Sequence, residues 1–276
     1  MSLLLVLLPL SCTLAAPKTN VATGSDPSRG SPEALKLAND LFLLGDGLKT
    51  FGVRGEATYR SGKNSSTYRF ELVAEKPDTY SFTVLVFGTP ALRAVSDGKI
   101  FKLFDYASGV SREGPAGDDS LLSRVPVPLD PETFLNVFSG SLPEAPSRAQ
   151  ALTALPSTVI SETVFDLASG DPGKTLRVAV RGGPDYSEEN PPKIESILFI
   201  ENGKTTLNVS YGDYRLHSRE DRDKKLFPFP GSLVLSWKDG SDKTLTVKYE
   251  EVNSGFLSRP GRFDLETPPG FRVMKF

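Results

Sequence analysis

Apolar and polar side chains alternate along most of the segment from Phe51 to Tyr106. In the stretches 51–60, 67–75 and 79–87, an apolar residue stands at nearly every second position, with Arg, Glu, Ser or Thr between. Successive side chains of a strand point to opposite faces of a sheet, so this period of two predicts β-strands with one apolar face. The short joints contain typical turn residues. We therefore predict an antiparallel meander whose aromatic face is covered by another part of the molecule.

Two more strands are predicted at 92–96 and 99–106, joined by Asp97-Gly98, a dipeptide typical of tight hairpins. The second of these strands has apolar side chains on both faces, so we expect it to be covered on both sides.

The second half of the chain shows the same alternation, with a hairpin signal at Asn202-Gly203. Together the two halves predict about eleven strands, enough for a sheet to curl and leave few exposed edges. The strand candidates of this half are 158–168, 175–181, 193–201, 205–214, 231–238 and 243–252, followed by extended pieces at 263–266 and 271–276.

Two helices are predicted from their start signals. Ser31-Pro32-Glu33 and Asp130-Pro131-Glu132 each combine an N-cap residue, a proline at the first helical position and an acid in the first turn. The first helix has an apolar stripe for packing on the sheet and is expected to fray at Gly45 and Gly47. The second is short, rich in Phe and closed by Gly140. We expect it either to cover the apolar face as a plug or lid, or to pack as an ordinary helix.

The N-terminus has the pattern of an export signal. Residues 3–10 are almost purely apolar, a run too short to span a bilayer but typical of a signal-peptide core. Cys12 follows this run as the lipidated Cys follows it in a bacterial lipobox, although the residues before it match that motif only in part. Cleavage after Ala15 or Ala16, which yields a soluble exported protein, and a Cys buried in a short helix are the alternatives.

Three segments are therefore expected. Residues 1–16 form the signal and lipobox region, 17–30 a polar, flexible tether, and 31–276 a single β domain.

The composition excludes several functions. With 32 Lys and Arg against 34 Asp and Glu, there is no broad basic field for nucleic acid. A single Cys and a single His exclude a disulfide framework and a multi-histidine metal site within one chain. The sequence lacks phosphate-binding and metalloprotease motifs and a nucleophile elbow. We expect no enzyme activity, no metal and no cofactor; His217, in a charged segment, is the best remaining candidate for a hydrolase.

The order of these features resembles the LolB/LolA family of lipoprotein carriers, and LolB-like relatives in particular: an export signal ending in Cys, a capped helix, a meander with an apolar turn at 87–92, an Asp-Gly hairpin, and an Asp-Pro-Glu helix ending in Gly. The resemblance covers most of the chain from Ser31 onward. It implies a mainly β fold, an unclosed (half) antiparallel β-barrel of about eleven strands with a helical lid over an apolar cavity.

The resemblance also implies a function: binding acyl chains of lipoproteins or lipids without covalent chemistry. The residues expected to line the cavity are Tyr68, Phe70, Leu72, Tyr80, Phe82, Val84, Phe101, Phe134 and Phe138. LolB has a protruding loop with an exposed Leu that helps to deliver cargo to the membrane. Leu92, with Phe87 as second candidate, matches that place, although Leu92 lies close to the next strand.

The expected location is the bacterial outer membrane, with the protein lipid-anchored through Cys12 and facing the periplasm. Expected partners are acyl chains, the membrane and a periplasmic carrier protein, with a monomeric chain and no nucleic acid. The alternative is a non-catalytic envelope lipoprotein that acts as a protein-interaction scaffold and docks through the apolar loop.

Overall fold

The alternating stretches of the sequence form long antiparallel strands in the structure, a computed structural model. The structure describes residues 32–116, 127–143, 153–155, 162–168, 173–181, 186–187, 190–218, 226–254, 263 and 265–275. The expected signal region, Cys12, the tether and the N-cap at Ser31 lie outside these residues.

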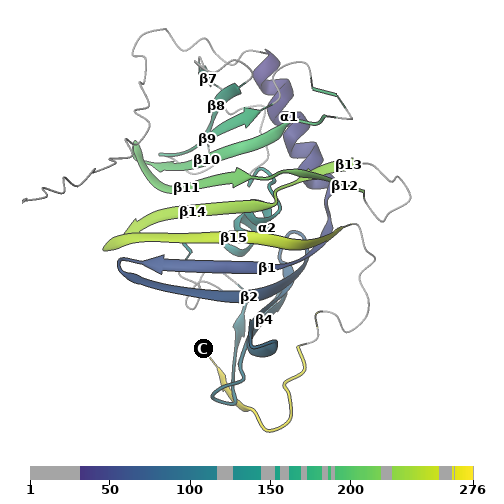
Figure 1. Cartoon of the computed structure of the whole chain (residues 1–276), viewed down its shortest axis with the longest axis vertical. Coiled ribbons are helices and arrows are strands. Elements are labelled where there is room, and N and C mark those ends of the chain that lie inside the picture. The colour runs from purple at the N-terminus through teal and green to yellow at the C-terminus, as the bar shows by residue number, and fades with distance from the viewer. Residues whose placement is uncertain are drawn as a thin grey trace, which may run out of the picture.

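Two helices and sixteen strands are described (Figure 1). Their bounds are α1 Pro32–Gly47, β1 Thr50–Ser61, β2 Asn64–Glu75, β3 Thr79–Val86, β4 Thr89–Asp97, β5 Ile100–Asp105, β6 Val110–Pro115, α2 Pro131–Phe138, β7 Thr153–Leu155, β8 Glu162–Ala168, β9 Lys174–Arg181, β10 Lys193–Glu201, β11 Lys204–Gly212, β12 Arg215–Ser218, β13 Leu226–Phe229, β14 Ser232–Asp239, β15 Ser241–Ser254 and β16 Arg272–Lys275.

One large sheet contains fourteen of the described strands, in the order β16-β6-β5-β4-β3-β2-β1-β15-β14-β11-β10-β9-β8-β7. Its pairs are antiparallel except for β16 with β6. The order is linear, with β16 and β7 as its two ends, so the sheet is unclosed. This confirms the predicted fold class. More strands are present than the eleven expected because β6, β7, β12 and β13 have only three to six residues each, too few for a period of two to be recognised. The strand β16 lies in the extended piece expected at 271–276, whereas the described residues of the piece expected at 263–266 form no strand.

The two halves of the sheet meet where β1 pairs with β15. The register shifts between Arg54 and Gly55, which marks a bulge at this seam. A side chain at position 55 would collide with the backbone carbonyl of Lys248, so only glycine allows the two strands to approach this closely.

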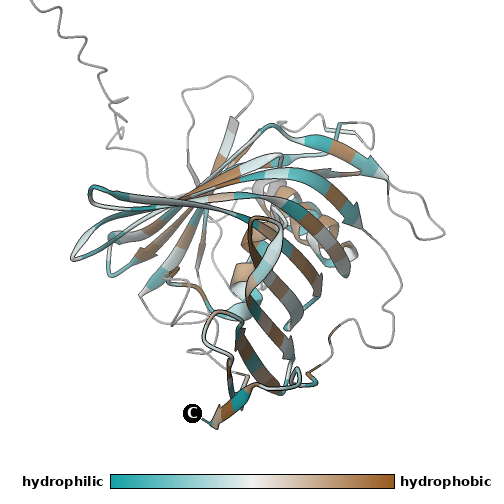
Figure 2. Cartoon of the chain, turned by 60° about the horizontal axis from the view of Figure 1, so that its bottom comes forward, coloured by the Kyte–Doolittle hydropathy of each residue, from teal (hydrophilic) through white to brown (hydrophobic). Residues whose placement is uncertain are grey.

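The helices lie on the concave side of the curved sheet (Figure 2). The α2 helix begins at the predicted N-cap, where the Asp130 side chain accepts a hydrogen bond from the Thr133 backbone N–H (2.9 Å). Its last carbonyl groups have no partners within the helix. Tyrosines of the sheet donate to two of them: Tyr211 to the Val137 oxygen (3.0 Å) and Tyr249 to the Phe138 oxygen (2.8 Å). The helix is thus held at both ends.

The α1 helix is joined to the same region through Lys76. The Lys76 ammonium group donates to the Gly45 carbonyl (3.3 Å) and to the Ser141 hydroxyl just after α2 (2.9 Å). A Cβ atom at Gly45 would lie only 2.7 Å from the Ser141 Cβ, so this glycine permits close helix contact. The expectation that Gly45 frays the helix is wrong, since α1 continues through Gly47.

The outer face of β5 is covered by the C-terminal segment, as predicted from its apolar pattern. Phe271 packs edge-on against Phe104 and Tyr106, with ring centroids 6.1 and 5.3 Å apart. Phe104 is only 1% exposed. No helix among the described residues has the length and apolar character needed to cross a membrane.

Candidate functional site

Seven of the nine residues predicted to line a cavity lie on β2, β3 and β5, and the other two lie on α2, but most of the nine are packed. Seven belong to the main hydrophobic core: Phe70, Leu72, Tyr80, Phe82, Phe101, Phe134 and Phe138. Val84 is partly buried against this core, and Tyr68 is 43% exposed. The structure therefore brings eight of the nine together and leaves Tyr68 at the margin.

Aromatic contacts explain why this part of the concave face is filled. Phe70 stacks on Phe82 (ring centroids 5.8 Å apart), and Phe82 meets Phe134 of α2 edge-on (6.4 Å). Phe134 in turn packs on Phe138 (4.1 Å). The apolar side of α2 thus occupies the space above the sheet, as a plug would.

Beyond α2 the same face is less covered. Tyr59 and Trp237 contact each other there, with ring centroids 6.2 Å apart. Tyr59, Ala57, Val84 and Leu92 are only partly buried. The apolar inner surface therefore extends toward the hairpin ends of the strands.

The two residues proposed for a membrane or partner loop lie in different places. Phe87 forms the tip of the β3–β4 hairpin together with Gly88, and its side chain is fully exposed. Leu92 lies inside β4, opposite Val84 and Asp105, and packs partly against the core. Only Phe87 has the position expected for a protruding apolar contact.

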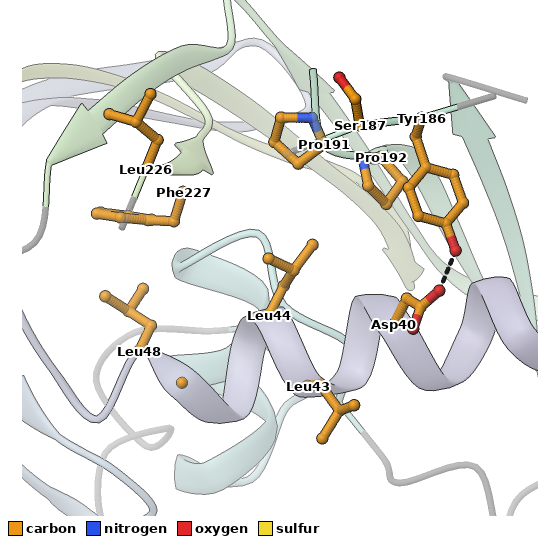
Figure 3. A pocket seen from close by; sticks show the side chains of 11 residues that line it. Asp40, Leu43, Leu44, Leu48, Tyr186, Ser187, Pro191, Pro192, Leu226 and Phe227 are labelled. Carbon is orange, nitrogen blue, oxygen red and sulfur yellow. Dashed lines mark hydrogen bonds between the residues drawn. The ribbon is translucent and has the colours of Figure 1, made fainter. Parts of the chain in front are cut away.

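A hollow of about 470 Å³, which the sequence analysis missed, lies beside α1 (Figure 3). Leu44 and Leu48 of α1 point toward Phe227 and the Pro191-Pro192 segment. The lining consists of Asp40, Leu43, Leu44, Gly47, Leu48, Tyr186, Ser187, Pro191, Pro192, Leu226 and Phe227. The four consecutive apolar residues at 41–44 could have indicated this hollow, because they make the apolar surface of the helix wider than one face packed on the sheet requires.

A polar network stands at one end of this hollow. Lys36 donates to the Tyr186 hydroxyl (2.6 Å) and to the Asp40 carboxylate (2.9 Å), and Tyr186 also donates to Asp40. Partial burial raises the pKa of Asp40, but the hydrogen bonds from Tyr186 and Lys36 outweigh it, so the pKa lies below its ordinary value. Burial and the bond to Asp40 raise the pKa of Tyr186. At neutral pH the network is a carboxylate, an ammonium group and a neutral phenol.

A second hollow, of about 590 Å³, lies on the side of α1 that faces α2. Lys76, Lys49, Asp46 and Glu132 give it a mixed charge. Burial lowers the pKa of Lys76 to about 7. Burial is the largest cause that raises the pKa of Glu132, and repulsion from the charges of Asp130 and Asp78 raises it further.

His217, the candidate for hydrolase chemistry, lies in β12 among aromatic rings. Its ring centroid is 5.9 Å from that of Phe227 and 6.1 Å from that of Phe229. Burial lowers its pKa, and the nearby Arg215 adds to this effect. The described residues contain no group of three or more His, Cys, Asp or Glu side chains placed to hold a metal ion.

No protein-family model matches the chain, and no curated protein sequence matches it. Several solved structures are similar. A LolA superfamily protein from Nitrosomonas europaea has a TM-score of 0.52 and 11% identity, covering 82% of this chain and 97% of the other. A DUF1329 family protein from Desulfovibrio piger has a TM-score of 0.59 and 8% identity, covering 87% and 98%. An outer membrane lipoprotein-sorting protein domain from Vibrio parahaemolyticus has a TM-score of 0.49 and 10% identity, covering 83% and 95%. With its large unclosed antiparallel sheet and few helices, the chain is LolA/LolB-like in its fold.

Proposed function

We propose that the protein binds acyl chains of lipids or lipoproteins in the apolar interior of its half-barrel, as a non-catalytic carrier in the bacterial envelope. The observation that carries this proposal is the aromatic concave face, whose core contains Phe70, Phe82 and Phe134 and whose outer part is only partly covered. The LolA-like fold supports it, because a solved structure of that superfamily shares the architecture.

The driving force would be burial of hydrocarbon. Each methylene group removed from water contributes roughly 0.8 kcal/mol. Tyr68 and Val84 are the predicted lining residues closest to solvent, and we propose that a chain first contacts them. The remaining predicted residues would become available where α2 moves away from the sheet. No reacting group is required for this process.

The proposed location is the periplasmic face of the outer membrane. Lipidation of Cys12 would anchor the chain, and residues 17–30 would let the β domain stand away from the membrane. Phe87 at the exposed hairpin tip would be the contact to the membrane or to a periplasmic carrier protein. Leu92 would instead be part of the inner face of the sheet that contacts the acyl chain, because it lies within β4.

Lipid extraction and probe binding test the proposal. The purified chain should release lipid into organic solvent, and the stripped protein should bind a fluorescent fatty-acyl probe to saturation. Tyr68→Ser should weaken this binding, whereas Ile100→Ser, at a similarly exposed apolar position (39% against 43%), should leave it unchanged. Absence of both extractable lipid and saturable binding would contradict the proposal.

A protein-interaction scaffold is the second candidate, and the close packing of seven predicted lining residues favours it. A scaffold would dock through Phe87. In that case Phe87→Ser abolishes capture of the partner from an envelope extract, and the stripped protein takes up no acyl probe.

A further inference from the structure

The hollow beside α1 combines a long apolar lining with one polar end. Leu44, Leu48, Phe227 and the two prolines form the apolar part, and Asp40 and Tyr186 stand together at one end (Figure 3). Ligand sites of proteins are typically apolar with a few well-placed polar groups, and occupy roughly 300–1,000 Å³. The volume here, about 470 Å³, lies within that range. Such a site suits an elongated molecule with one polar end.

The volume suits a single chain. About 470 Å³ is in the lower half of the range found for ligand sites and has room for one long acyl chain. This hollow is open in the structure as it stands, whereas α2 would have to move before a chain could enter the packed part of the concave face.

The charges at the polar end select the head group. The Asp40 carboxylate lines the hollow, while the Lys36 ammonium group is already hydrogen-bonded to both Asp40 and Tyr186. A free fatty-acid carboxylate has no proton to donate to Asp40, and the Lys36 charge is already offset by Asp40. A hydroxyl or an amide can instead donate to the carboxylate and accept from the phenol or the ammonium group.

We propose that the hollow between α1, the two pairs Tyr186-Ser187 and Pro191-Pro192, and β13 holds one acyl chain that ends in a neutral hydroxyl or amide group. This inference rests on the proposed acyl-binding function and adds to it a second site, distinct from the concave face, with its head group. The same chemistry occurs in a monoacylglycerol and in an amide-linked acyl chain, so both are tested separately.

Because the chain has a single Trp, fluorescence quenching can show where a lipid binds. Trp237 lies on the concave face beside Tyr59 and is not among the residues that line the hollow. Leu226 lines the hollow and is 45% exposed, so Leu226→Trp should place an indole at the site at little cost in packing. Trp237→Phe removes the native indole from the core, and the Trp237→Phe single variant is the control for its effect on binding. A lipid with a brominated tail quenches an indole only at close range.

The experiment titrates stripped protein with tail-brominated monoacylglycerol, N-acyl glycinamide and fatty acid of equal chain length. We expect the two neutral lipids to quench the indole introduced by Leu226→Trp in the Trp237→Phe background. Quenching of native Trp237 in the unmodified chain reports separately on binding at the concave face. We expect both neutral lipids to bind about fivefold or more tightly than the fatty acid, because only a hydroxyl or an amide can donate a hydrogen bond to the Asp40 carboxylate, and one such bond is worth about that factor. If only one neutral lipid binds, it identifies the source of the chain.

Three variants complete the test. Asp40→Asn should remove most of the preference against the fatty acid. Leu44→Gln should weaken binding of all three lipids, whereas Leu35→Gln, on the same helix but outside the hollow, should not. Quenching of Trp237 alone, or equal binding of the charged and neutral lipids, would overturn the inference and leave the acyl-binding function standing. Absence of binding by any lipid would overturn both.

Discussion

Phe87 shows how one residue can depart from what its local structure prefers. Its backbone has φ 52°, in the left-handed region, and the following Gly88 has φ 78°. Two-residue hairpin turns of this kind favour Asn-Gly, because a bulky side chain at positive φ is strained. An aromatic ring that is both strained and fully exposed contributes nothing to the core.

Phe87→Asn should therefore stabilise the fold and weaken contact with membranes. Relief of the left-handed strain is worth about 1 kcal/mol in the free energy of unfolding, which urea denaturation can measure. Sedimentation with anionic vesicles should show less bound protein. Met274→Asn, at another exposed apolar position, is the control and should change neither measurement greatly. Unchanged vesicle binding by the Phe87 variant would argue against the tip as a membrane contact.

Lys76 gives the stability of the protein a pH dependence. Burial lowers its pKa from 10.5 to about 7 in the folded chain, with the nearby charges of Asp46, Lys49 and Glu132 acting in both directions. Between about pH 7 and 10 the unfolded chain then binds more protons at this site, so stability rises with pH. Below pH 7 Lys76 is protonated in both the folded and the unfolded chain, so the folded chain bears the full cost of burying its charge.

Lys76→Met should flatten this rise. The free energy of unfolding of the native chain should gain up to about 1 kcal/mol per pH unit over the variant between pH 7.5 and 9. Urea denaturation across this range measures the difference. Lys238→Met, which removes an exposed lysine that is not among the charges acting on Lys76, should keep the native slope. Parallel curves for the native chain and the Lys76 variant would mean that Lys76 stays charged in the fold.

At the scale of elements, α2 decides whether the concave face is a core or a binding surface. Its apolar side packs on Phe82, and Tyr211 and Tyr249 hold its carboxyl end by hydrogen bonds. Burial raises the pKa of both tyrosines, so they remain donors at neutral pH.

Tyr211→Phe with Tyr249→Phe should loosen α2 without changing the apolar packing. The Phe138 carbonyl would lose the Tyr249 donor, at a cost of about 1–3 kcal/mol where it stays dry. The Val137 carbonyl would lose the Tyr211 donor but keep a hydrogen bond from the Gly140 backbone N–H (3.1 Å). Amide hydrogen exchange in residues 131–141 should become faster. Where α2 acts as a lid, uptake of the acyl probe should rise as well; faster exchange with unchanged uptake would identify α2 as a fixed plug. Tyr59→Phe, which keeps the concave face but does not touch α2, is the control.

At the scale of the whole molecule, the β1–β15 seam joins the two halves into one sheet. Gly55→Val should separate the strands, because its side chain would meet the Lys248 carbonyl. We expect a loss of about 1–3 kcal/mol in the free energy of unfolding, measured by urea denaturation. Gly62→Asn, at a turn with open space and positive φ, should be nearly neutral. Equal stability of both variants would mean that the seam adapts to a side chain.

The sequence by itself determined the fold class and the face on which each side chain lies. The period of two placed Phe70, Leu72, Phe82 and Phe101 on the inside of the sheet, and the apolar pattern of β5 revealed its coverage on both sides. The Asp-Pro-Glu signal located the start of α2. These features are local, since strand period and helix capping depend on neighbouring residues.

Only the tertiary structure decided how much of the inner face is filled and where a ligand-sized space remains. A strand pattern does not show what packs on its apolar face, and α2 comes from about fifty residues further along the chain than Phe82. The hollow beside α1 joins Asp40 to Tyr186, 146 positions apart, and to β13 beyond them. Such a site depends on how distant segments pack, which no local periodicity records.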